Sequence, residues 1–264
     1  MLDNEDVATK RKYIRSKKSM LFFGGQMGII NKLFKKDVDE LSDAGWFLKA
    51  HSLWNHEKGN FYKPQEALKY LDQAIKLNPN KGEAYGSRGI AYFQLGKYNL
   101  SVENHTQAIK IDPRYIMNYI NRAHAYFQLR MYEKAIEDTI QATQLDPNAT
   151  VSYAVRAGFY SQLEKHDLVI KEYDQIIRLE PNNAAYYYAR GWNYAVELDD
   201  HQKAIEDYNR AIRLDPNQTL LYIARGKSYS ILNDFERMCR DYKKACDLGD
   251  CESLQIAKRQ GYCL

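Results

Sequence analysis

The six histidines are the first candidates for acid–base or metal chemistry in this chain, and their spacing does not support it. His51 and His56 are five residues apart, so on one helix they point to different faces. The sequence contains no HExxH pair, no nucleophile elbow and no phosphate-binding loop. Gly24, Gly25 and Gly28 do not follow a predicted strand. We therefore expect a noncatalytic protein with no cofactor and no bound metal.

The four cysteines all lie near the C-terminus, at Cys239, Cys246, Cys251 and Cys263. They form no CxxC pair, and Cys239 and Cys246 share one face of a predicted helix. This spacing favours buried free thiols over metal ligands. It points to a reducing compartment, and we expect a cytoplasmic location.

Arginine recurs at one position of five alternate predicted helices, the first helix of each hairpin, and a carboxylate recurs at one position of the second helices. A guanidinium group can hold a carboxylate through two hydrogen bonds, so matched pairs would fix the register of neighbouring helices. A basic stripe for nucleic acid is the alternative, but the matched carboxylates leave little free positive charge. We expect a structural ladder and no nucleic-acid partner. Its members are Arg88, Arg122, Arg156, Arg190 and Arg225, with Asp138, Glu172, Asp207 and Asp241, and Asn104 in the second unit.

A repeat of about 34 residues organises the chain. Its prolines stand at Pro79, Pro113, Pro147, Pro181 and Pro216, with spacings of 34, 34, 34 and 35 residues. Apolar residues follow two helical steps within each period, and the proline ends the second helix. Small residues at matched positions let the two helices approach closely. The pattern predicts an all-α solenoid of antiparallel helix hairpins.

The second unit carries the motif most fully, with Tyr85, Gly89, Tyr92, Gly96, Tyr98, Ala108 and Pro113. This pattern resembles the tetratricopeptide repeat (TPR) family. The resemblance implies a right-handed superhelical solenoid of about six repeats. We place a basic lead-in with a short amphipathic segment at 1–40, the TPR array at 41–252 and a C-terminal capping helix at 253–264. The repeats are 43–80, 82–115, 116–149, 150–183, 184–218 and 219–252, and extra residues in WNHEKGNFYKP should lengthen the first interhelix loop.

The resemblance also implies a concave face, lined by variable positions of the first helix in each unit. The fourth unit has only small side chains there, Ala154, Gly158 and Ser161, while its neighbours have large aromatic ones. We expect an aromatic-walled pocket for an apolar anchor of a peptide or partner helix; the alternative is that these aromatics only cover neighbouring helices. The predicted partner-binding residues are Ile90, Phe93, Ile120, His124, Phe127, Gly158, Tyr188, Trp192, Ile223 and Lys227.

The N-terminal segment differs in charge from the array. The chain has a net charge of +4, and the segment from Val7 to Lys36 contains lysine and arginine but no acidic residue. The apolar run from Met20 to Ile30 is too short to span a bilayer, which needs about 20 apolar residues. A short helix docked on the first repeat, weak membrane-surface contact through residues 10–36 and a secretory signal are the alternatives. Met27 also resembles an alternative start.

Composition fits a folded array, with 45% hydrophobic and 13% aromatic residues. The prediction is a noncatalytic protein–protein interaction module, an adaptor or assembly scaffold that binds a peptide or partner helix in an apolar concave groove. The alternative is a membrane-surface-associated assembly factor that uses its basic N-terminal segment for localisation.

Overall fold

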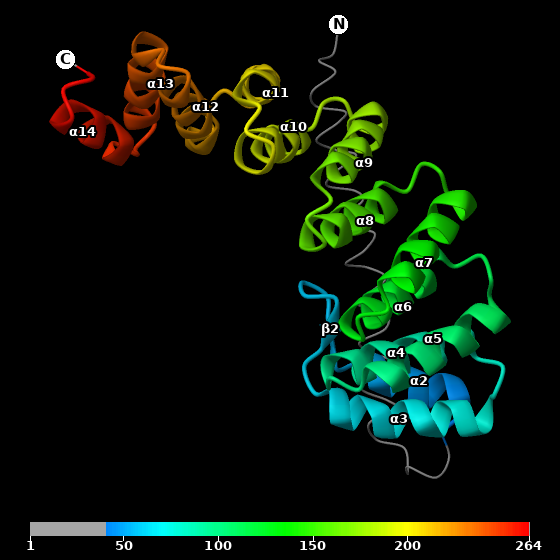
Figure 1. Ribbon diagram of the computed structural model, residues 1–264. Coiled ribbons are helices and arrows are strands. Elements are labelled where there is room, and N and C mark those ends of the chain that lie inside the picture. Colours follow the sequence, from blue (N-terminus) through cyan, green and yellow to red (C-terminus); the bar gives the residue numbers. More distant parts are fainter. Residues whose placement is uncertain (1–40, 264) are drawn as a thin grey trace, which may run out of the picture. The chain divides into compact units, whose positions relative to one another are not determined.

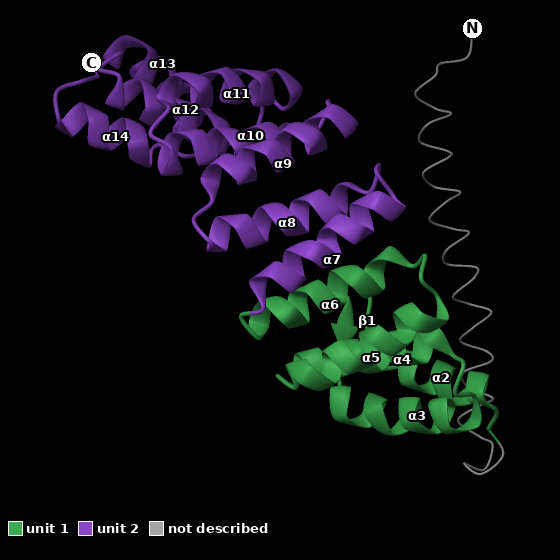
Figure 2. Ribbon diagram, turned by 45° about the vertical axis from the view of Figure 1, so that its right-hand side comes forward, with its two compact units in different colours: residues 1–130 green, residues 131–264 purple. Residues whose placement is uncertain are grey.

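The computed structural model describes residues 41–263 as a succession of helix hairpins (Figure 1). The all-α prediction is confirmed. The described residues fall into two compact units, which divide between Arg130 and Met131 (Figure 2). The predictions for the lead-in at 1–40, including membrane contact through residues 10–36, lie outside the described residues.

The first unit pairs its helices in sequence order. Helix α2 packs on α3, α3 on α4, α4 on α5 and α5 on α6. Their bounds are α2 Asp43–His51, α3 Pro64–Leu77, α4 Gly82–Gln94, α5 Tyr98–Ile111 and α6 Ile116–Gln128.

The loop between α2 and α3 contains a small β ladder in place of an open turn. Strands β1 (Trp54–Asn55) and β2 (Asn60–Phe61) pair antiparallel, with Trp54 opposite Phe61. Phe61 is buried. The Gln94 carboxamide accepts from the Phe61 backbone N–H at 2.9 Å and donates to the Phe61 carbonyl at 3.1 Å. The predicted extra residues therefore form a structured hairpin anchored to α4.

The second unit continues the hairpins and ends on a short helix. Helices α8 and α9, α10 and α11, and α12 and α13 form pairs, and α14 packs on α13. Their bounds are α7 Tyr132–Leu145, α8 Thr150–Gln162, α9 His166–Leu179, α10 Ala184–Trp192, the π-helix η2 Asn193–Glu197, α11 His201–Leu214, α12 Thr219–Ile231, α13 Phe235–Asp247 and α14 Glu252–Arg259.

The proline link between hairpins is held by a repeated hydrogen bond. A tyrosine hydroxyl six residues downstream donates to the proline carbonyl over 3.0–3.2 Å. This carbonyl cannot be satisfied within the preceding helix, because the proline lies beyond its end. The bond explains one role of the abundant tyrosines. The pairs are Tyr119 with Pro113, Tyr153 with Pro147, Tyr187 with Pro181, and Tyr222 with Pro216.

The two helices of a hairpin meet where a glycine faces a ring. A Cβ atom placed on Gly226 would lie 2.5 Å from Cε1 of Tyr242, and one on Gly89 would lie 2.6 Å from Nε2 of His105. Both distances are far inside van der Waals contact, so only glycine fits opposite these rings. The predicted close approach at small residues is confirmed at these positions.

The arginine ladder is present within both units. Nε and Nη2 of three arginines donate to both oxygens of one carboxylate over 2.6–2.9 Å. In the second repeat, Arg88 Nε donates instead to the Asn104 carboxamide oxygen at 2.7 Å. The three bidentate pairs are Arg156 with Glu172, Arg190 with Asp207, and Arg225 with Asp241.

Each arginine in these bonds also reaches back to the preceding hairpin through Nη1, a second contact that sequence reasoning missed. Examples are Arg88 to Asp72 at 2.7 Å and Arg190 to Asp174 at 2.5 Å. One guanidinium group therefore joins two consecutive repeats within a unit.

The prediction of free thiols is wrong. Cys239 bonds to Cys263, and Cys246 bonds to Cys251. The chain turns back after α14, which brings Cys263 to α13, and a short turn brings Cys251 to the end of the same helix. Helix-face spacing could not reveal this return of the tail. The inference of a reducing compartment loses its basis with the free thiols.

Within residues 41–263, no helix combines the length and the apolar character needed to cross a bilayer.

Candidate functional site

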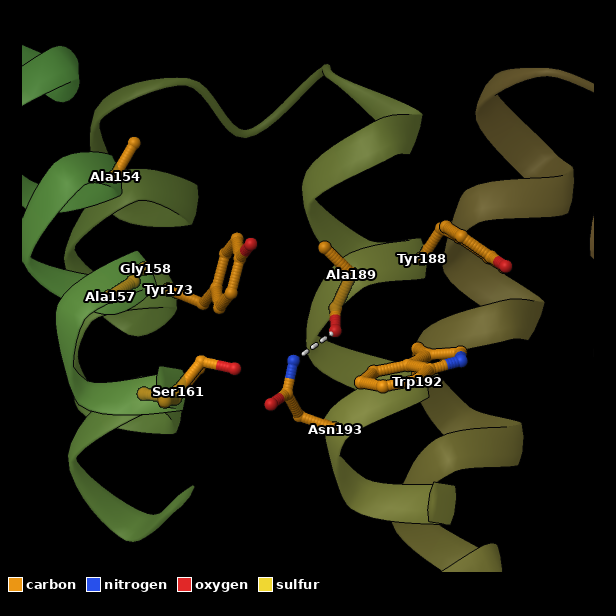
Figure 3. A pocket seen from close by; sticks show the side chains of 10 residues that line it. Ala154, Ala157, Gly158, Ser161, Tyr173, Tyr188, Ala189, Trp192 and Asn193 are labelled. Atoms are coloured by element: carbon orange, nitrogen blue, oxygen red, sulfur yellow. Dashed lines mark hydrogen bonds between the residues drawn. The ribbon is translucent and has the colours of Figure 1, made fainter. Parts of the chain in front are cut away.

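Helices α8, α9 and α10 of the second unit border an open pocket of about 410 Å³ (Figure 3). This volume lies within the range of about 300–1,000 Å³ that is typical of ligand pockets. Small residues of α8 form one wall, and residues of α10 form the opposite wall. The pocket is lined by Ala154, Ala157, Gly158, Ser161, Val169, Tyr173, Tyr188, Ala189, Trp192 and Asn193.

The α8 wall is open because its residues are small. Gly158 is exposed, and a Cβ atom built on it would have no neighbouring heavy atom within 4 Å. Ala154 is exposed and Ser161 is half-buried on the same helix. Glycine is therefore not required here by packing, in contrast to Gly226 and Gly89. Space for a larger side chain is available at this wall.

Tyr173 lines the pocket because its hairpin departs from the glycine–ring pattern. It stands at the position of Tyr208 and Tyr242 in the later repeats, but the residue facing it is Ala157. Gly191 faces Tyr208 in the later hairpin, and a Cβ atom at Gly191 would collide with the Tyr208 ring. Ala157 has such a Cβ atom, so the Tyr173 ring cannot take the position of the Tyr208 ring. Tyr173 is half-buried whereas Tyr208 is 1% exposed. Burial, with a smaller contribution from Tyr186, raises the pKa of Tyr173.

The other wall ends in a π-helix, η2, which accounts for the single repeat of 35 residues. Leu198 N donates to the carbonyl of Asn193 at 3.2 Å, five residues back, so the extra residue widens one turn. His166 of α9 and Glu197 of η2 lie 3.4 Å apart, between Nε2 and Oε2. Such widened turns occur frequently at functional sites.

Asn193 is a buried polar residue at the edge of this turn. It is 6% exposed, and its Nδ2 donates to the carbonyl of Ala189 at 2.8 Å. Its Oδ1 is buried and has no hydrogen-bond partner among the described residues. The adjacent Trp192 is 39% exposed, a large fraction for an indole side chain.

The lining is uncharged. Among the described residues that border the pocket there is no aspartate, glutamate, lysine, arginine or histidine. In the same described part of the chain, no group of three or more histidine, cysteine or carboxylate side chains is placed to hold a metal ion. The pocket suits a neutral, largely apolar group.

The predicted binding residues are distributed unevenly. Gly158, Tyr188 and Trp192 line the pocket, whereas Ile223 is half-buried and Lys227 exposed on α12, outside its lining. Tyr173 and Asn193 also line the pocket and were not among the predicted residues. Tyr173 departs from the glycine–ring pairing and Asn193 begins the widened turn of the 35-residue repeat, so both signals were present in the aligned repeats.

The other predicted residues belong to the first unit. His124 and Phe127 are not among the residues that line the pocket of the second unit, and their part in partner binding stays a prediction. Ile120 and Phe127 are 2% and 8% exposed, and their side chains belong to the packing. His124 Nδ1 donates to the carbonyl of Ile120 at 2.9 Å, and burial lowers its pKa. Ile90 and Phe93 are half-buried on α4.

Three family models match the repeats described above. Models described as "Tetratricopeptide repeat" match residues 119–149, and residues 184–218 with 220–248. A model described as "TPR repeat" matches residues 89–130. The chain is a tetratricopeptide repeat protein. In this TPR protein the matched segments include α10, η2 and α11, so the inserted residue does not disrupt the repeat signature.

Solved structures support the same fold. The C-terminal part of a TPR repeat-containing protein from Cytophaga hutchinsonii is 17% identical, with a TM-score of 0.66, over 82% of this chain and 83% of that one. A TPR protein from Parabacteroides merdae is 18% identical, with a TM-score of 0.57, over 94% and 98%. YrrB, described as a TPR protein with an unusual peptide-binding site, is 16% identical, with a TM-score of 0.55, over 72% and 97%. No curated protein sequence matches the chain.

Proposed function

We propose that this TPR protein is a noncatalytic adaptor or assembly scaffold that binds a peptide segment or a partner helix. The pocket between α8 and α10 takes an apolar anchor side chain of that partner. The observation that carries this proposal is an uncharged pocket of about 410 Å³, open at Gly158 and bordered by the exposed Trp192. Anchors of this kind contribute most of the binding free energy at protein interfaces.

Exposed apolar residues on three successive first helices support an extended partner. Val151 on α8, Trp192 on α10 and Leu220 on α12 are 40%, 39% and 46% exposed. They belong to the positions that the family pattern assigns to the concave face. YrrB, which shares the fold, is described as having a peptide-binding site, and this also supports a peptide partner here.

Peptide display on the full chain tests the proposal. Peptides selected on the wild-type protein are expected to lose at least about tenfold in affinity for Gly158→Arg, because the new side chain fills the open wall. Trp192→Ala should weaken the same peptides by removing an exposed anchor contact. Affinities are measured by fluorescence polarisation.

Gln202→Arg is the matched control, since it adds the same charge at an exposed position of α11 that does not line the pocket. It should bind every selected peptide as the wild type does. Selected peptides that bind Gly158→Arg and the wild type equally well would contradict the proposal, as would a selection that enriches none.

A further inference from the structure

One buried polar atom of the pocket residues has no hydrogen-bond partner within the described structure. Asn193 Oδ1 is buried and unpartnered, although buried side-chain oxygens in proteins are nearly always hydrogen-bonded. The Asn193 carboxamide is directed toward α8, where the hydroxyl of Ser161 faces it across the pocket (Figure 3). No hydrogen bond joins these two side chains within the described structure, and both residues line the pocket.

The orientation of this carboxamide is held by its other end. Nδ2 donates to the carbonyl of Ala189 one turn earlier, which directs Oδ1 away from the helix backbone. The aligned repeats have Ala91, Ala125, Phe159 and Ser228 at this position, so an amide is not part of the repeat scaffold. The amide and the π-turn that follows it occur in the same repeat, beside the same pocket.

An acceptor in an uncharged, apolar lining defines the ligand chemistry. A lysine or arginine side chain would bring a charge, and no residue of the lining carries the opposite charge. A carboxylate has only acceptor lone pairs, so it cannot donate a hydrogen bond to Asn193 Oδ1. An aliphatic side chain would leave Oδ1 unpartnered, and a carboxamide has little apolar surface to fill the pocket. An indole ring has a large apolar surface and a single N–H donor with no acceptor.

We infer that the pocket takes a tryptophan side chain of the partner, with the indole N–H donating to Asn193 Oδ1. This inference rests on the proposed function, because it names the anchor that the pocket receives. The ring is bordered by Gly158 and Ala154 of α8, by Tyr173 of α9 and by Trp192 of α10.

Two probes of the same shape, one with and one without the indole N–H, test the hydrogen bond on the wild-type protein. The full chain, labelled with ¹⁵N, is titrated by NMR with N-acetyl-tryptophanamide and with N-acetyl-3-benzothienylalaninamide, in which sulfur replaces the indole N–H. The wild-type protein is expected to bind the tryptophan probe about tenfold more tightly, because the analogue leaves Oδ1 unpaired. Asn193→Leu should bring the ratio near one. Asn99→Leu, at an exposed position of α5, should leave the ratio unchanged.

The outcomes separate this inference from the proposed function. Equal affinity of the wild type for the two probes, tighter binding of N-acetylglutaminamide, or tryptophan binding that Gly158→Arg does not weaken would overturn the tryptophan anchor. The peptide selection could still succeed in each of these cases with another apolar anchor. A selection without pocket-dependent peptides would reject the proposed function, and the tryptophan anchor with it.

Discussion

The ring of Tyr208 packs so closely against Gly191 that a Cβ atom at position 191 would lie 2.9 Å from Cε1 of the ring. Tyr208 is 1% exposed, so its ring has little room to move away. The equivalent positions in the preceding hairpin hold Ala157 and Tyr173, and there the ring is half-buried and lines the pocket. One methyl group at a repeat position therefore separates a packed hairpin from one with a cavity beside it.

Gly191→Ala should lower the free energy of unfolding by about 1–3 kcal/mol, as overpacking of a closed site does. Gly158→Ala is the matched control. It should be neutral or stabilise the protein by up to about 1 kcal/mol, because alanine is the better helix former and nothing obstructs its Cβ. Urea denaturation monitored by circular dichroism gives both values. A Gly191→Ala protein as stable as the wild type would contradict the packing argument.

Arg156→Met should destabilise the second unit by about 3–5 kcal/mol, because it leaves a buried carboxylate without its partner. Arg156 and Glu172 are each 8% exposed and share two hydrogen bonds. Arg240→Met removes an exposed partner of Glu236 and should cost less than about 0.5 kcal/mol. Urea unfolding of the two variants beside the wild type measures the difference. Similar small losses in both would show that the ladder does not stabilise the array.

Acid should destabilise the first unit through His105. Burial lowers the pKa of His105 to about 4, although its bond to Asn118 opposes the shift. The folded state therefore favours the neutral imidazole. Its stabilising contribution is fully present above the ordinary pKa of about 6.5 and is lost as the pH falls from there toward 4.

His105→Leu should flatten this dependence, reducing the change in unfolding free energy between pH 7.5 and 4.5 by about 2–3 kcal/mol. Gln107→Leu, at an exposed position of the same helix, should leave the pH profile unchanged. Thermal and urea melts at a series of pH values provide the comparison. An unaltered slope in His105→Leu would refute the assignment to this histidine.

The two disulfides should differ in their effect on stability because they close loops of different length. In the chain-entropy account, losing Cys239–Cys263, 24 residues apart, costs about 3.5 kcal/mol, and losing Cys246–Cys251, five apart, about 2 kcal/mol. Paired serine substitutions of each bridge, studied by urea denaturation, test the order. A thiol assay on the unreduced, unfolded protein should detect no free cysteine. Detection of free thiols would contradict the pairing.

Sequence reasoning succeeded where one residue type recurs at one position. The bidentate arginine pairs followed from matched spacing alone, as the Arg225–Asp241 pair shows. The small-residue wall at Gly158 was found in the same way, by comparing repeats. Burial was harder to predict, because sequence position says which helix carries a side chain, not whether neighbouring helices cover it. Phe127 is only 8% exposed.

The sequence by itself determined the hairpin array, because a 34-residue period, two helical steps and a closing proline are local signals that each repeat restates. Only the tertiary structure decided which rings pack and which line a pocket. It also decided that the extra residue widens the turn after Asn193 and that Cys263 returns to Cys239. These outcomes depend on distances between atoms that are remote in sequence, where a single Cβ or one turn of the chain changes what fits.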